Sequence, residues 1–151
     1  AEPVALVREH ALGKARSVHR DGAWTLGVDT TVHLDGRVFG KAADPIEATA
    51  MLRTLAGKTH DVVSGVCLLG PSVERVETAT TRVTFRRLSP RTVADYVATG
   101  EWEGRAGAYA IQGLGARLVA SVTGDYLNVV GLPAALLLDL LEQHFAAPLG
   151  G

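Results

Sequence analysis

The sequence has few of the features that mark a secreted, membrane or nucleic-acid-binding protein. A single cysteine, Cys67, excludes an internal disulfide, and its place in an apolar strand pattern favours a small buried side chain over a nucleophile. No signal peptide is visible, and no apolar run approaches the length that spans a membrane. The 15 basic and 16 acidic residues form no long run of one sign, so bulk attraction to nucleic acid or to an anionic membrane is not indicated. These absences fit a cytoplasmic protein without nucleic-acid or membrane partners, and 151 residues suffice for one domain with a real core.

The first residues have the periodicity of a helix. Within residues 3–20, apolar side chains recur at spacings of three and four, at Val4, Val7, Ala11, Ala15 and Val18. Lys14 lies next to this stripe and not on it. From the pattern alone, Lys14 is a solvated lysine.

The stretch Trp24–Lys41 has the pattern of a β-hairpin with a charged pair. A short apolar strand, 26–28, carries Asp29 and Thr30 at its end, and residues 31–34 continue in strand character. Asp35-Gly36 is typical of a two-residue hairpin turn, and residues 37–39 form the return strand before Gly40-Lys41. A carboxylate and a lysine on paired strands, with glycines beside both, suit an anionic, metal-bound ligand. From spacing alone, a surface acid–lysine pair is the favoured interpretation.

The rest of the chain alternates helices and strands. The pattern predicts helices that begin after the N-cap residues Asp44 and Ser89, and a last helix over Pro133–Phe145. Strands are expected over 61–69, 76–87 and 117–123, which makes the fold class mixed α/β. Residues 101–116 contain four glycines without regular periodicity, which favours tight turns or close approach of a ligand. Gln112 lies among these glycines, where its amide could contact a substrate or satisfy loop backbone groups.

Four collinear blocks, which together span nearly the whole chain, resemble the Maf family of nucleoside triphosphate pyrophosphatases, first described as septum-formation inhibitors. VDTTVHLDGRVFGK is similar to the family signature ADTVV-LDG-GKP. The other three blocks are EATAMLRTLAGKTHDVVSGV, AGAYAIQGLGA and GDYLNVVGLP. Asp29-Thr30 together with the segment 109–112, Tyr-Ala-Ile-Gln, resembles the branch of the family that acts on dTTP and UTP.

The resemblance implies a fold, a reaction and roles for particular residues. The fold is a two-lobed, ITPase-like α/β structure with a central cleft and frequent homodimers. The reaction is metal-dependent hydrolysis of dTTP, UTP or modified nucleotides to the monophosphate and pyrophosphate, with Mg²⁺ or Mn²⁺ as cofactor. Asp29 is expected to be the base or a metal ligand, Lys14 and Lys41 to contact phosphates, and Thr30 and Gln112 to position the substrate. Arg105 stands where the family has lysine, and its role stays open.

One family feature has no counterpart in this chain. Family members begin with a strand and a phosphate-binding Ser-Pro-Arg-Arg loop, which precede the position that matches Glu2. Two interpretations follow from this. If a segment with this loop precedes Ala1 in the whole protein, the chain is expected to be the pyrophosphatase that the four blocks imply. If it does not, the chain is expected to be a catalytically impaired nucleotide-binding or partner-binding protein involved in cell division control.

Overall fold

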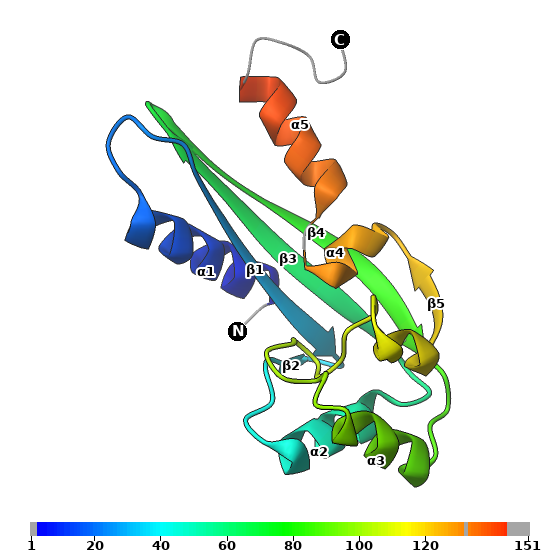
Figure 1. The fold of residues 1–151 in the computed structure, drawn as a ribbon. Coiled ribbons are helices and arrows are strands. Elements are labelled where there is room, and N and C mark those ends of the chain that lie inside the picture. The colour runs from blue at the N-terminus through cyan, green and yellow to red at the C-terminus, as the bar shows by residue number, and fades with distance from the viewer. Residues whose placement is uncertain (1–2, 132, 145–151) are drawn as a thin grey trace.

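The computed structural model describes residues 3–131 and 133–144 and arranges them as a mixed α/β fold (Figure 1). The predicted fold class is thereby confirmed. In chain order, the helices and strands are α1 (Pro3–Val18), β1 (Thr25–Leu34), β2 (Arg37–Phe39), α2 (Pro45–Leu55), β3 (Thr59–Gly70), β4 (Val73–Phe85), α3 (Pro90–Ala98), the 3₁₀ helix η1 (Leu114–Leu118), β5 (Val119–Thr123), α4 (Tyr126–Val130) and α5 (Ala134–His144). No helix among these residues is both long enough and apolar enough to cross a membrane.

The sheet is antiparallel throughout, in the order β2-β1-β3-β4-β5. Strand β3 lies at its centre, and eight consecutive residues of this strand, 62–69, are buried, as expected of a strand covered on both faces. The turn between β1 and β2 is the predicted two-residue turn. Both of its residues have positive φ, 49° at Asp35 and 79° at Gly36.

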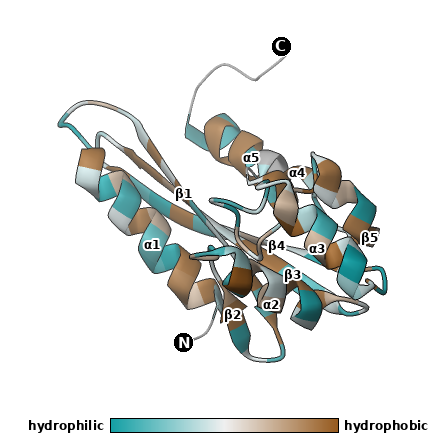
Figure 2. Cartoon of the chain, turned by 60° about the horizontal axis from the view of Figure 1, so that its bottom comes forward, coloured by the Kyte–Doolittle hydropathy of each residue, from teal (hydrophilic) through white to brown (hydrophobic). Residues whose placement is uncertain are grey.

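Helices α1 and α5 cover opposite faces of one half of the sheet (Figure 1). Successive side chains of β3 alternate between them: Cys67 packs with Ala11 and Ala15 of α1, whereas Leu68 packs with Leu140 of α5. The burial of Cys67 agrees with its predicted structural role. Figure 2 shows hydrophobic and hydrophilic residues side by side along α1, as expected of a helix with one buried side.

Two glycines let α1 lie unusually close to the sheet. Gly27 of β1 and Gly65 of β3 both face the helix. A Cβ atom on Gly27 would collide with the carbonyl oxygen of Ala11, and one on Gly65 with the carbonyl oxygen of Val7. The helix backbone therefore occupies the space that side chains of other residues would fill.

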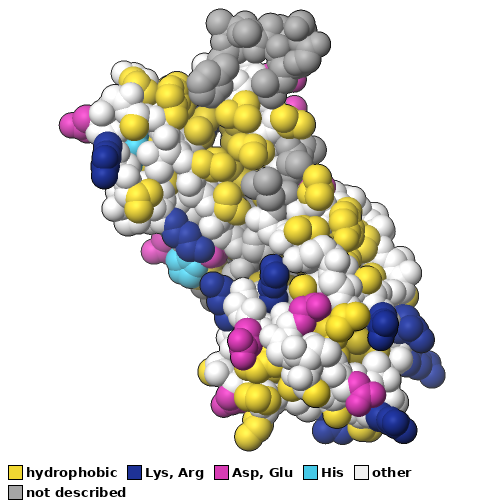
Figure 3. All heavy atoms as spheres, in the orientation of Figure 1, with side chains coloured by type: hydrophobic (Ala, Val, Ile, Leu, Met, Phe, Trp, Pro, Cys, Tyr) yellow, Lys and Arg dark blue, Asp and Glu magenta, His cyan; other side chains and the backbone are white. Residues whose placement is uncertain are grey.

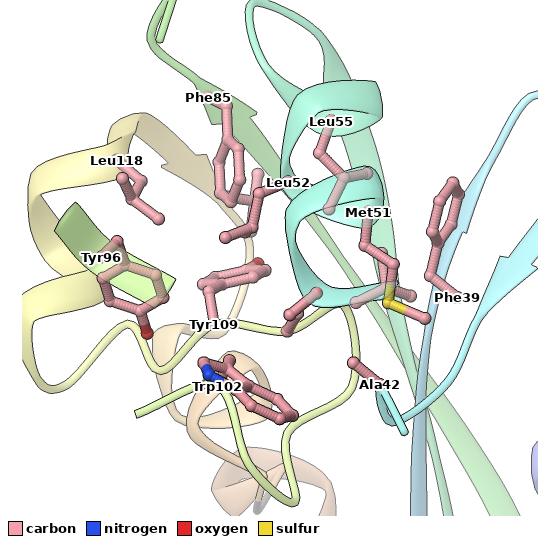
Figure 4. Close-up of a cluster of buried hydrophobic side chains, with 14 of the residues drawn as sticks. Phe39, Ala42, Met51, Leu52, Leu55, Phe85, Tyr96, Trp102, Tyr109 and Leu118 are labelled. Carbon is pink, nitrogen blue, oxygen red and sulfur yellow. The ribbon is translucent and has the colours of Figure 1, made fainter. Parts of the chain in front are cut away.

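The largest core lies at the other end of the sheet, where α2, α3 and the glycine-rich loop (residues 101–116) pack together (Figure 4). The helix starts are the predicted ones. The side chain of Asp44 accepts a hydrogen bond of 2.7 Å from the Glu47 N–H, and that of Ser89 one of 3.1 Å from the Thr92 N–H. These caps satisfy backbone donors that a helix start leaves unpaired.

Several boundaries differ from the prediction. Strand β1 is continuous, so Asp29 and Thr30 lie within it and not at the end of a shorter strand. Residues 114–118 form a 3₁₀ turn, so only 119–123 of the last predicted strand are extended. The last helix ends at His144, and its predicted end, Phe145, lies outside the described residues.

Candidate functional site

A hollow of about 250 Å³ lies between the half of the sheet covered by α1 and α5 and the half that carries α2 and α3. Basic side chains and a histidine gather on the surface between these two halves of the molecule (Figure 3). All five candidate site residues line the hollow, together with Arg105 and Tyr109; the five are Lys14, Asp29, Thr30, Lys41 and Gln112. Residues 129–131, at the end of α4, close it from another side.

Asp29 is the acidic centre of the hollow. Its Oδ1 accepts a hydrogen bond of 2.8 Å from the Lys14 ammonium, and its Oδ2 lies 3.3 Å from the His10 ring nitrogen Nδ1. Lys14 also donates to the carbonyl oxygen of Val28 at 3.2 Å. The Asp29 side chain is 13% exposed, whereas Lys14 and His10 are half exposed, so solvent and ligands reach the carboxylate through a basic rim.

Asp29 and Thr30 point to opposite faces of the sheet. Asp29 pairs with Gly65 on the face that α1 covers, whereas Thr30 pairs with Ser64 on the other face. The Thr30 and Ser64 hydroxyls share a hydrogen bond of 2.7 Å. Within the described residues, β2 pairs with β1 only over residues 32–34, so the edge of β1 beside Asp29 borders the hollow directly. The edge of the strand, and not one face, brings both side chains to the same site.

Lys41 is held beside the glycine-rich loop by backbone contacts. It forms an isolated β-bridge with Ala106, and the Gly107 N–H donates to the Gly40 carbonyl oxygen at 3.1 Å. Gly107 has a φ of 71°, and a Cβ atom there would come within 2.8 Å of the Val32 side chain. Among the described residues, no carboxylate lies within ion-pair distance of the Lys41 ammonium.

Tyr109 connects the hollow to the buried core. Its hydroxyl lies 2.7 Å from Nε2 of His60, and its ring packs edge-on against Phe85 with centroids 4.8 Å apart. His60 is 1% exposed, and burial lowers its pKa to about 4, so its ring is neutral at physiological pH. Burial also raises the pKa of the Tyr109 hydroxyl. This pair is therefore an uncharged support behind the site.

The family resemblance pointed to five residues that line the hollow, and the sequence left others unassigned or open. His10 was not predicted, although it lies four residues before Lys14 and therefore on the same side of α1. Tyr109 was noted only as part of a motif, and no role was assigned to His60. Arg105 was considered, and the structure places it on the wall of the hollow.

The chemistry of the hollow suits a metal held jointly with a ligand. In the described part of the chain, no three His, Cys, Asp or Glu side chains gather closely enough to hold a metal ion by themselves. Mg²⁺ is usually bound through one or two carboxylates together with substrate phosphates. Asp29 could supply such a carboxylate, and three basic side chains that line the same hollow could bind the phosphates: Lys14, Lys41 and Arg105.

Comparison with known proteins places the chain in a family. The sequence profile of the family described as Maf-like protein matches residues 1–144. The chain is 45% identical over 144 residues to a dTTP/UTP pyrophosphatase of Koribacter versatilis, which is 94% of this chain and 75% of that relative. It is 50% identical over 145 residues to a dTTP/UTP pyrophosphatase of Moorella thermoacetica, which is 92% of this chain and 74% of that relative. On the family profile and these identities, the chain belongs to the Maf family.

Proposed function

We propose that this protein hydrolyses dTTP and UTP to the nucleoside monophosphate and pyrophosphate. One observation carries the proposal beyond the names of its relatives. Three basic side chains and one carboxylate line a single hollow in a chain whose net charge is −1. This local excess of positive charge suits a triphosphate, and the carboxylate supplies the acid–base group that hydrolysis needs.

The basic side chains offset the charge of the phosphates. An ammonium has three N–H donors. Among the described residues, Lys14 uses two of them, toward Asp29 and Val28, which leaves one for a phosphate oxygen. Lys41 has no ion pair to give up and can approach the phosphates directly. When bound, Mg²⁺ or Mn²⁺ adds further positive charge where negative charge develops on the leaving pyrophosphate.

Asp29 is proposed to act as the general base toward water or as a ligand of the metal. As a base, its carboxylate takes a proton from a water molecule whose oxygen attacks the α-phosphorus. The new P–O bond completes the nucleoside monophosphate, the bond from the α-phosphorus to the α–β bridging oxygen breaks, and that oxygen leaves with the pyrophosphate. Thr30 and Gln112, which also line the hollow, are proposed to orient the nucleotide.

The test is pyrophosphate release by the protein produced from its complete reading frame, with a panel of nucleoside triphosphates and Mg²⁺ or Mn²⁺. We expect turnover of dTTP and UTP, and a loss of about 10²–10⁴-fold in kcat for Asp29→Asn, the range of general acid–base catalysis. Asp35→Asn is the matched control, because Asn also tolerates the positive φ of the hairpin turn.

Three results would count against the proposal. A kcat in Asp29→Asn equal to that of the unaltered protein would remove Asp29 from the mechanism. An equal loss in Asp35→Asn would show that the hairpin and not the carboxylate is needed. Nucleotide binding by calorimetry without any turnover would favour the alternative of a non-catalytic nucleotide-binding protein.

A further inference from the structure

The side chain of Glu101 is tied to the backbone on the far side of the glycine-rich loop. Its Oε1 accepts from the Gly115 N–H at 3.0 Å, and its Oε2 from the Leu114 N–H at 3.1 Å. The Tyr96 hydroxyl donates to Oε1 at 2.9 Å and accepts in turn from the Ala110 N–H at 3.0 Å. We call these two side chains and three backbone N–H groups the Glu101 network.

The Glu101 network holds the chain on both sides of Gln112. Tyr96 fixes Ala110, two residues before it, and Glu101 fixes Leu114, two residues after it. Between these points the Gly113 N–H donates to the Ala110 carbonyl oxygen at 3.1 Å, which closes a tight turn with Gln112 inside it. The backbone of Gln112 is thus defined by contacts to residues outside the turn.

Gly113 and Gly115 leave no room for a side chain, because atoms of the Glu101 network and of the turn occupy that space. A Cβ atom on Gly113 would come within 2.5 Å of Glu101 Oε2, so the carboxylate lies where a side chain would be. A Cβ atom on Gly115 would collide with the Ala110 carbonyl oxygen. The close fit of backbone and carboxylate leaves the turn little freedom to move.

The network also has a defined charge. Burial acts to raise the pKa of Glu101, but the hydrogen bonds from Gly115, Leu114 and Tyr96 outweigh it and lower that pKa. Burial raises the pKa of Tyr96, whose ring lies in the core cluster (Figure 4). At neutral pH the carboxylate is therefore an acceptor and the phenol a donor.

We propose that Glu101 and Tyr96 are positioning residues that hold Gln112 toward the hollow for substrate binding. This inference rests on the proposed function, because it takes Gln112 as a substrate contact. Neither side chain lines the hollow, so both act through the turn.

The test is a double-mutant cycle between Glu101→Gln and Gln112→Ala, measured as kcat and KM for dTTP or UTP. Glutamine keeps the size of the side chain but replaces one acceptor oxygen with an NH₂ group, so one backbone N–H loses its partner. We expect Glu101→Gln to lower kcat/KM by about tenfold through a higher KM, since small misplacements of a substrate contact cost up to about 10²-fold. In the Gln112→Ala background the same change should cost less than about twofold, because residues that act through one another are not additive.

Amide hydrogen exchange gives a second readout that does not depend on turnover. Residues 110–115 should exchange faster in Glu101→Gln and in Tyr96→Phe, while β3 keeps its protection. Glu103→Gln is the matched control, an exposed glutamate two residues along the chain, and should change neither exchange nor kcat/KM.

The possible failures are distinguishable. No turnover by the unaltered protein, or an unchanged kcat/KM in Gln112→Ala, would overturn the proposed role of Gln112 and the inference that depends on it. A full tenfold loss from Glu101→Gln in both backgrounds, with Gln112→Ala itself impaired, would overturn the positioning role alone. Unchanged exchange over residues 110–115 would do the same.

Discussion

Among the candidate site residues, the surroundings of Lys41 most clearly distinguish a role in ligand binding from a role in the stability of the fold. Its backbone bridges to Ala106, but its ammonium has no ion pair among the described residues and lines the hollow. The side chain therefore contributes little to the stability of the fold. Its charge is available to a phosphate.

We expect Lys41→Met to lower kcat/KM by about 10–100-fold, which corresponds to one charge-assisted hydrogen bond of about 1.5–3 kcal/mol. The melting temperature should stay within a degree or two of the starting value. Steady-state kinetics and thermal unfolding check both statements. Lys58→Met, which removes an exposed lysine outside the hollow, is the control and should leave both unchanged. A large fall in melting temperature for Lys41→Met would assign this lysine to the fold.

At the scale of elements, the contact of α1 with the sheet decides the geometry of the site. Lys14 and His10 come from α1, whereas Asp29 comes from β1. Their distances depend on how closely the helix lies on the sheet, and that closeness depends on Gly27 and Gly65. If α1 were pushed away from the sheet by the width of one methyl group, the side chains of Lys14 and His10 would move away from the Asp29 carboxylate.

Gly65→Ala is expected to lower the free energy of unfolding by about 1–3 kcal/mol, the usual cost of overpacking, because the new methyl group meets helix backbone that cannot yield locally. Turnover should fall as well. Gly13→Ala is the control, on α1, the helix that Gly65 of β3 faces. A Cβ atom on Gly13 meets nothing within 4 Å, and the change should raise the free energy of unfolding by about 0.5–1 kcal/mol. Urea unfolding and the pyrophosphate assay measure the two variants. Equal stability of Gly65→Ala and the unaltered protein would contradict the close-contact account.

At the scale of the whole molecule, one buried cluster joins the sheet to the site. His60 of β3, Phe85 of β4 and Tyr109 of the glycine-rich loop pack edge-on, with ring centroids 4.8–5.5 Å apart. His60 is neutral there because burial lowers its pKa to about 4, from an ordinary value of 6.5. Folding is consequently coupled to pH through a residue that the proposed chemistry does not use.

The sign of this coupling is set by which state binds the proton. Between pH 6.5 and pH 4 the unfolded chain protonates His60 and the folded chain does not, so stability falls as the pH is lowered through this window. The full loss is about 3 kcal/mol, reached below pH 4. We expect the difference in unfolding free energy between the unaltered protein and His60→Gln to shrink by this amount from pH 7.5 to pH 4. Two parallel curves in denaturant titrations would contradict it.

The homodimer implied by the family resemblance also stays a prediction, which light scattering can check.

The sequence by itself determined the elements whose causes are local. Asp35-Gly36 forms its turn, and Asp44 and Ser89 cap their helices, through contacts within a few residues. The candidate residues Lys14, Asp29, Thr30, Lys41 and Gln112 followed from motif resemblance, and the structure brings all five to one hollow. Their chemical roles remain proposals.

Only the tertiary structure decided how these residues meet. It laid α1 over the face of β1 that carries Asp29, brought His10 to Asp29 across 19 positions, and set the Glu101 carboxylate against a turn more than ten residues away. No periodicity records such contacts, because they depend on how closely α1 lies on the sheet and on where the glycine-rich loop folds back. Local hydrogen bonding specifies elements, whereas packing of the backbone at glycines specifies the distances on which the site depends.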